Sequence, residues 1–308
     1  MLVIDVYSSP TLDVIEDRLC RGGPAYYAQL ALHAIGAADA RVRLALPTCI
    51  DAEWYLDADW CPGSVHAEGY ECATVFAVKE GHGGRRLRVL REPDPLEPDP
   101  RGDAALVSPV LGELEPAEAA RLLTHYRLAI VDVQGFGRVN GGGEVEAFSR
   151  GVLAFLEQPA EPGGFAAVKL SLEDVAGAAW AAEAVRLHRH APYSALLVTA
   201  GPRGALAVLG DGSALAVRPR RVEAVSTGAG DMLSVLTLYG LWKGWDLEDA
   251  VAGAAAAVAC ILLERSRRGR VEEGACKASF MGRRGVSVEK LPGGCSSADC
   301  IVMAFEQG

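Results

Sequence analysis

Short apolar runs alternate with helix-length segments through the middle of the chain, and this alternation constrains the fold more than any other feature. The strand-like runs cover residues 104–107, 128–133, 165–170 and 195–199. The helix-like segments between them cover residues 115–125, 143–156 and 172–190. Strands separated by helices predict β-α-β units, and therefore an α/β fold whose mainly parallel sheet has helices on both faces.

The first hundred residues carry the same signals in a looser arrangement. We expect a buried strand over residues 2–6, and a helix that begins at Gly22-Gly23-Pro24 because proline suits the first helical position. Residues 72–79 and 85–90 predict a β-hairpin with one apolar face. An isolated hairpin is only marginally stable, so it must pack on the body of the protein, a substrate or a second subunit.

Composition narrows the class of protein. The chain has 308 residues, of which 50% are hydrophobic and 23% charged, so it is expected to be globular. Its net charge of −10 and its lack of a basic block argue against a nucleic-acid partner. No basic segment precedes the first apolar strand, and the apolar run 250–263 is shorter than the ~18 residues that span a bilayer. We therefore expect a cytoplasmic protein with no membrane partner.

Eight cysteines are present, and none of them forms a Cys-x-x-Cys pair. A zinc site is therefore not expected. Most of the cysteines are expected to be small buried hydrophobes or free thiols. A disulfide stays open as an alternative, because intracellular disulfides do occur in hyperthermophiles.

The motif with the clearest chemistry is Ser226-Thr227-Gly228-Ala229-Gly230-Asp231, which opens the apolar run 232–242. If a helix begins here, its first N–H groups are unpaired and the positive end of its dipole lies behind them, which favours a bound phosphate. Asp231 would then lie beside that phosphate as a proton acceptor, an arrangement suited to phosphoryl transfer. The alternative reading is an ordinary glycine loop followed by an acidic residue in the first helical turn.

A second motif, Thr199-Ala200-Gly201-Pro202-Arg203-Gly204, follows the strand-like run 195–199. In this order and spacing the two motifs resemble those of the ribokinase-like (PfkB) carbohydrate kinases. The resemblance implies a three-layer α/β/α fold with a mainly parallel central sheet and a small β lid. It implies a kinase domain over residues 1–265, with the lid formed by about 64–92 and the 8–18 region. We expect residues 266–308 to form an irregular tail that packs on the domain edge, with weak strand-like pieces at residues 286–288 and 301–303.

The resemblance also implies roles for individual residues. Asp231 would be the catalytic base, and the backbone of Gly228, Ala229 and Gly230 the anion hole. The cofactor site, for ATP or ADP with Mg²⁺, would include Lys169, Ser171, Thr199, Gly201, Gly204 and Thr227. Asp174 would serve the metal indirectly, through water. The substrate side would include Asp13, Gly22, Gly23, Tyr27, Gln134 and Arg138, although a structural role at a strand end is an equal alternative for Gln134 and Arg138.

Four positions depart from the family pattern. Ser171 and Asp174 differ from the Asn-x-x-Glu element that serves magnesium and phosphates. Val225 stands where the family usually has an Asp that helps to bind a monovalent cation, which puts potassium activation in doubt. Tyr27 stands where sugar-specific members often carry Asn. The stretches 23–27, 85–90 and 131–136 are similar to the myo-inositol kinase branch.

Three functions follow from these patterns. The first is a kinase that phosphorylates a hydroxyl of a sugar or a cyclitol, with myo-inositol favoured. The second is a nucleoside or sugar-phosphate kinase, with ADP as a further donor, since Arg85, Arg86 and Arg88 near the lid could hold a phosphorylated substrate. The third is a non-catalytic nucleotide or metabolite sensor. We expect a small-molecule substrate and a nucleotide as partners, and a monomer or a homodimer formed through the lid.

Overall fold

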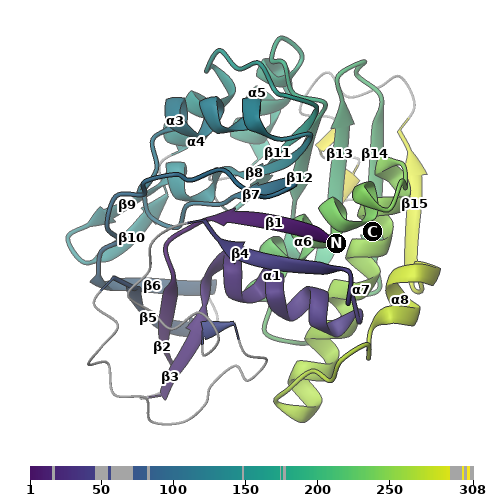
Figure 1. Ribbon diagram of the computed structural model, residues 1–308, viewed down its shortest axis with the longest axis horizontal. Coiled ribbons are helices and arrows are strands. Elements are labelled where there is room, and N and C mark those ends of the chain that lie inside the picture. The colour runs from purple at the N-terminus through teal and green to yellow at the C-terminus, as the bar shows by residue number, and fades with distance from the viewer. Residues whose placement is uncertain are drawn as a thin grey trace.

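The alternating runs build one large sheet with helices on both faces (Figure 1). The computed structural model describes residues 1–15, 18–45, 55–56, 72–81, 84–147, 149–173, 175, 178–291, 300–301 and 304–305. The prediction of an α/β fold with a mainly parallel central sheet is confirmed.

The central sheet has nine strands in the order β15-β14-β13-β12-β11-β8-β7-β1-β4. The pairs from β12 to β4 are all parallel, whereas β13, β14 and β15 join in antiparallel fashion. The strands are β1 (Leu2–Tyr7), β4 (Ala40–Leu44), β7 (Ala104–Val107), β8 (Leu128–Asp132), β11 (Phe165–Ser171), β12 (Ala195–Thr199), β13 (Ala205–Leu209), β14 (Ala214–Pro219) and β15 (Val286–Lys290).

Each face of the sheet has its own apolar core, because side chains alternate between the two faces of a strand. Ile130 packs into the core beneath α1 (Gly23–Ala34), α6 (Ala229–Trp242) and α7 (Leu247–Arg268). Its neighbour Val131 packs into the opposite core. The opposite core is covered by α3 (Pro116–Leu122), α4 (Ser149–Leu156) and α5 (Ala178–His188). These are the three layers that the family resemblance implied.

A second, smaller sheet lies at the edge of the body and forms the lid (Figure 1). It has six strands in the order β3-β2-β5-β6-β10-β9. These strands are β2 (Thr11–Ile15), β3 (Arg18–Gly22), β5 (Thr74–Gly81), β6 (Gly84–Arg91), β9 (Arg138–Gly141) and β10 (Glu144–Ala147). Residues 64–71, which the sequence assigned to the lid, lie outside the described residues.

The helix predicted over residues 143–156 is wrong in its first part. Residues 144–147 form β10, and α4 begins only at Ser149. Gly142 and Gly143 have φ angles of +75° and +110°, so the chain turns sharply and β9 and β10 pair as a hairpin. Val145 packs against the lid core of Phe76, Val78 and Val110, which stabilises the strand over the helix.

The segment beyond residue 265 contains regular structure. α7 continues to Arg268 and ends at Gly269, whose φ of +70° suits a helix C-terminus. A short helix, α8 (Lys277–Gly282), follows, and β15 then pairs antiparallel with β14 at the edge of the central sheet. The strand-like piece expected over residues 301–303 is wrong at residue 301, which is helical. Residues 292–299, 302–303 and 306–308 lie outside the described residues.

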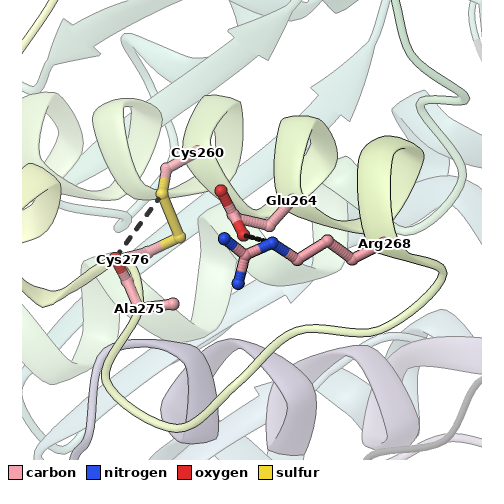
Figure 2. The surroundings of a disulfide bond; sticks show 5 residues. All are labelled: Cys260, Glu264, Arg268, Ala275 and Cys276. Carbon is pink, nitrogen blue, oxygen red and sulfur yellow. Dashed lines mark hydrogen bonds and ion pairs between the residues drawn. A yellow bond between two sulfur atoms is a disulfide. The ribbon is translucent and has the colours of Figure 1, made fainter.

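Most cysteines were expected to be small buried hydrophobes or free thiols. Cys20, Cys276 and Cys300 are buried, but the expectation of free thiols is wrong for the cysteines that the structure describes. Cys260 of α7 is bonded to Cys276, which precedes α8, and the ion pair between Glu264 and Arg268 runs beside this disulfide (Figure 2). Cys20, Cys72 and Cys300 are also disulfide-bonded, and no free cysteine occurs among the described residues. The alternative that the sequence left open, a disulfide-bonded protein, is therefore the one realised.

Candidate active site

One cavity of about 520 Å³ lies between the lid and the carboxyl ends of β8, β11 and β12. This is where ligands bind in α/β sheets. Most of the predicted site residues line it, namely Asp13, Gly23, Tyr27, Gln134, Arg138, Lys169, Ser171, Thr199, Gly201, Gly204, Thr227, Gly228, Ala229, Gly230 and Asp231. Gly22 does not line it but lies behind Asp13, since a Cβ at Gly22 would be 2.6 Å from Asp13 Oδ2. Asp174 lies outside the described residues.

The start of α6 has the geometry expected of an anion-binding site, which we call the anion cradle. Gly228 is its N-cap, with a φ of +81°, and the amide of Met232 donates to the Gly228 carbonyl at 3.0 Å. Gly230 and Asp231 belong to the first turn, where amides have no acceptor within the helix. The amide of Ala229 instead donates to the Ser226 carbonyl at 2.9 Å. Among the predicted anion-hole residues, Ala229 therefore has its N–H engaged in a turn.

Asp231 lies in that first turn with only 8% of its surface exposed. Its Oδ1 accepts a hydrogen bond from Ser108 Oγ at 3.4 Å, and Ser108 in turn accepts one from Gln134 Nε2 at 3.2 Å. Burial and the negative charge of Asp132 raise the pKa of Asp231 to about 7, although the cations Lys169 and Arg138 act in the opposite direction. A carboxylate with a pKa near neutrality is well suited to general base catalysis.

A buried ion pair lies beside the cradle. Lys169 on β11 and Asp132 at the end of β8 are register partners, and Nζ lies 2.5 Å from Oδ2. A Cβ at Gly230 would be 2.9 Å from Lys169 Nζ, so the ammonium group reaches the backbone of the cradle. Such a cation can stabilise negative charge on a transferred phosphoryl group. Sequence reasoning did not select Asp132, although a carboxylate that ends an apolar strand was the available signal.

The lid side of the cavity is polar at its base and apolar above. Asp13 is 1% exposed, and Phe76 and Leu87 line the wall contributed by the lid. Tyr55, a residue that sequence reasoning also missed, donates its hydroxyl to the Gly22 carbonyl and accepts a hydrogen bond from the Thr11 amide. These contacts hold the junction between the lid and α1.

The opposite side of the cavity combines a glycine turn with an apolar wall. Gly204 has a φ of +104°, and a Cβ there would be 2.1 Å from the Val217 carbonyl, so only glycine fits this turn. The wall is formed by small and branched side chains from α7 and the chain before α6. They are Val222, Ala224, Ala255, Val258, Ala259 and Leu262. An apolar slot that leads away from an anion cradle can hold the flat base of a nucleotide.

The residues present are compatible with magnesium held mainly by phosphate oxygens and water. Mg²⁺ commonly takes only one or two protein carboxylates beside its phosphate and water ligands. Glu173 lines the cavity, and its amide donates to Ser171 Oγ at 3.1 Å. Among the residues that the structure describes, no cluster of three or more His, Cys, Asp or Glu could form a dedicated metal cage.

Arg265 of α7 is the most unexpected residue of the site. It is 5% exposed, and its Nη2 donates to the carbonyls of Val225 and Thr227 at 2.7 and 3.0 Å. Sequence reasoning did not select it, and residue 265 was only the expected end of the kinase domain. The available signal was its position: Arg265 lies on the same face of α7 as the buried residues Ile261 and Leu262.

Comparisons with known proteins agree with this geometry. Residues 166–272 match the family model for pfkB family carbohydrate kinases. No curated protein matches the chain. One similar solved structure is a pyrophosphate-dependent myo-inositol-1 kinase that was converted into a myo-inositol-3 kinase by mutation. The sequence identity is 16% and the TM-score is 0.61, and the match covers 92% of this chain and 99% of that chain.

Two further similar structures come from named organisms. One is the fructokinase of Vibrio cholerae O395 bound to fructose, ADP and calcium, with 16% identity, a TM-score of 0.60 and coverage of 91% of this chain and 99% of that chain. The other is the Methanocaldococcus jannaschii nucleoside kinase, an archaeal member of the ribokinase family, with 13% identity, a TM-score of 0.59 and coverage of 92% and 99%.

These findings confirm the resemblance inferred from the two glycine motifs. The fold is that of the ribokinase family, and residues 166–272 carry the pfkB signature. The prediction of a PfkB-type phosphotransferase is thereby confirmed at the level of the family model. In the described part of the chain, no helix is both long enough and apolar enough to cross a membrane.

Proposed function

We propose that this chain, which has the ribokinase fold and the pfkB signature, transfers the terminal phosphoryl group of ATP to a hydroxyl of a sugar or a cyclitol. One observation carries the proposal. A buried carboxylate whose pKa is raised to about 7, Asp231, lies in the same helical turn that forms the anion cradle.

Each residue of the site has a distinct task in this reaction. Asp231 accepts the proton of the attacking hydroxyl, and the open amides of α6 hold the phosphoryl oxygens. Lys169 offsets the negative charge that develops beside the cradle. Magnesium, when bound with the nucleotide, supplies further charge neutralisation. The lid side chains Phe76 and Leu87 exclude water from the acceptor.

The charge distribution supports an uncharged acceptor. Asp13 and Asp231 line the cavity, and their negative charges would repel a phosphorylated substrate. The cations Arg138 and Arg220 also line it, while Lys169 is paired with Asp132. Of the lid residues on β6, Leu87 lines the cavity. Arg86 and Arg88 are its neighbours along the strand, so their side chains point to the opposite face. For Arg86 and Arg88 this arrangement disfavours a contact with a phosphorylated substrate.

Among uncharged acceptors we favour myo-inositol. The sequence stretch 23–27, which includes Tyr27 of the cavity wall, is similar to the myo-inositol kinase branch. A structural neighbour is itself described as a myo-inositol-1 kinase. That neighbour uses pyrophosphate, whereas the apolar slot formed by Val222, Val258 and Leu262 supports a nucleotide donor in this chain.

The test is a turnover assay with Mg²⁺ in which ATP, ADP and pyrophosphate are offered separately. The acceptor panel contains myo-inositol, fructose, ribose, ribose 1-phosphate and nucleosides. We expect turnover with ATP and a neutral polyol, and none with pyrophosphate. Turnover with a phosphorylated acceptor would overturn the acceptor class, and turnover with pyrophosphate would overturn the donor. Nucleotide binding without turnover on any acceptor would favour a sensor.

A further inference from the structure

The loop that enters the anion cradle is held from below by a buried cation. The guanidinium group of Arg265 donates to the carbonyls of Val225 and Thr227, at 2.7 and 3.0 Å. These residues flank Ser226 and lead directly to Gly228, the N-cap of α6. The two carbonyl oxygens therefore converge on one nitrogen of a side chain from a different helix, α7.

The two carbonyl oxygens converge where the Thr227 contact is buried and the Val225 contact is partly buried, so they need N–H donors or a cation, because an unsatisfied buried acceptor is costly. Arginine provides both at once, since its guanidinium carries donors in a rigid fork and stays charged at all physiological pH values. Val225 contributes only its backbone here, because its side chain has no carboxylate. Of the three residues in these contacts, Arg265 is therefore the one that brings a charge to the loop.

Tyr27 ties the same cation to the cradle. The guanidinium carbon of Arg265 lies 5.8 Å from the centroid of the Tyr27 ring, which is within the range of a cation–π contact. A Cβ at Gly228 would lie 2.3 Å from that ring, so the ring packs directly on the N-cap of α6. Arg265 thus supports Gly228 both through its hydrogen bonds to the preceding loop and through the Tyr27 ring.

From these contacts we propose that Arg265 is a positioning residue for the donor phosphates. Its guanidinium is a permanent cation, supplied by the protein itself, that holds residues 225–228 in their anion-binding conformation. The enzyme consequently needs no added monovalent cation. This inference rests on the proposed phosphotransferase function, but its binding test does not require turnover.

The test compares Arg265→Lys and Arg265→Met with the wild type, with Arg267→Met as the matched control. Arg267 is an exposed arginine on the same helix, two residues further on. Calorimetry measures binding of ADP and of pyrophosphate, and kinetics measure kcat and KM for ATP. We expect Arg265→Met to weaken ADP and pyrophosphate binding and to lower kcat/KM for ATP, each at least about 10-fold. Arg265→Lys should recover part of the loss, and Arg267→Met should match the wild type.

A rescue experiment separates a local role from general unfolding. Arg265→Ala is assayed for ADP binding with millimolar guanidinium chloride and, in parallel, with equal urea, a neutral molecule of the same shape. We expect guanidinium to raise the ADP affinity of Arg265→Ala at least about threefold, and urea to leave it unchanged. Wild-type kinetics in potassium, sodium and tetramethylammonium chloride should agree within about twofold.

Three results would overturn the inference. They are unchanged anion binding in Arg265→Met, equal rescue by urea, and a wild-type rate that rises more than about 10-fold with potassium. These outcomes differ from a failure of the proposed function, which would be an absence of turnover by the wild type on every acceptor. In that case the binding and rescue arms still decide the role of Arg265.

Discussion

The ammonium nitrogen of Lys169 lies 2.5 Å from a carboxylate oxygen of Asp132, and both side chains are almost completely buried. Asp132 is therefore engaged by a cation, which leaves Asp231 as the carboxylate best placed to accept a proton. The negative charge of Asp132 nevertheless acts on Asp231 and raises its pKa. The ion pair thus helps to set the strength of the base beside it.

Removing the base should separate chemistry from binding. We expect Asp231→Asn to lower kcat at least about 10²-fold, because a positioned general base contributes about 10²–10⁴-fold. ADP affinity should stay close to that of the wild type, since the amides of the cradle are unchanged. Ser108→Ala, which removes the hydrogen bond to Asp231 and the one from Gln134 but keeps the carboxylate, is the milder comparison. Full activity in Asp231→Asn would exclude its role as the base.

The pH dependence of kcat/KM should report the same carboxylate. Asp231 must be deprotonated to accept a proton, so activity should fall as the pH drops through about 7. Asp132→Asn removes a like charge, lowers the pKa of Asp231 and should move this acidic limb to lower pH. A limb that stays in place in Asp132→Asn would contradict the coupling between the two carboxylates.

Stability should change with pH in the opposite sense to activity. The pKa of Asp231 is about 7 in the folded protein and 3.8 in its ordinary state, so between these values the folded protein binds more protons than the unfolded chain. The contribution of Asp231 to stability is then complete below about pH 4 and is lost as the pH rises towards 7. Asp231→Asn should therefore raise Tm relative to the wild type at pH 8 and have a smaller effect at pH 5. Equal shifts at the two pH values would argue that the pKa of Asp231 is not raised.

Gly228 tests the contact between the cradle and Tyr27. Gly228→Ala would place a Cβ 2.3 Å from the Tyr27 ring at a φ of +81°, so both overlap and backbone strain oppose it. The matched control is Gly244→Ala, which has a similar φ of +85° with no atom within 4 Å. We expect the control to lose about 1 kcal/mol from strain alone, and Gly228→Ala to lose at least about 2 kcal/mol and most of its activity. Denaturant unfolding and kcat/KM measure the two effects, and equal losses would argue against the packing contact.

The disulfide between Cys260 and Cys276 closes a loop over a sequence separation of 16 residues. Replacing both cysteines by alanine should lower the free energy of unfolding by about 3 kcal/mol, the value typical of a loop of this length. Treatment of the wild type with a reductant reports on every disulfide, and should therefore lower Tm by more than the double substitution does. A double variant as stable as the wild type would show that α8 is held on α7 by packing alone.

The features of the fold that depend on local sequence pattern could be predicted from the sequence. The alternation of strands and helices, and the glycines that turn the chain at Gly204 and Gly228, can be recognised from residues close together in the chain. The strand β10 was missed because Glu144, Val145 and Glu146 are too few to distinguish strand from helix. Val145 is held there by lid residues that are distant in sequence.

The contacts that the sequence did not reveal are those made across the fold. Asp132 meets Lys169 only because β8 and β11 are neighbours in the sheet, and Arg265 reaches Val225 only because α7 packs behind the cradle. Disulfide pairing was equally hidden, because cysteine spacing does not specify a partner. Such pairings are properties of the tertiary structure, which local propensity does not encode.

The two halves of the cavity come from different parts of the chain. The glycine turn after β12, the apolar slot and the cradle lie within the segment 166–272 that matches the carbohydrate kinase model. Asp13, Tyr27, Gln134 and the lid strands lie outside it. The halves can therefore diverge at different rates in evolution. If the proposed function holds, substitutions in the lid would change the acceptor and leave the residues around the anion cradle as they are.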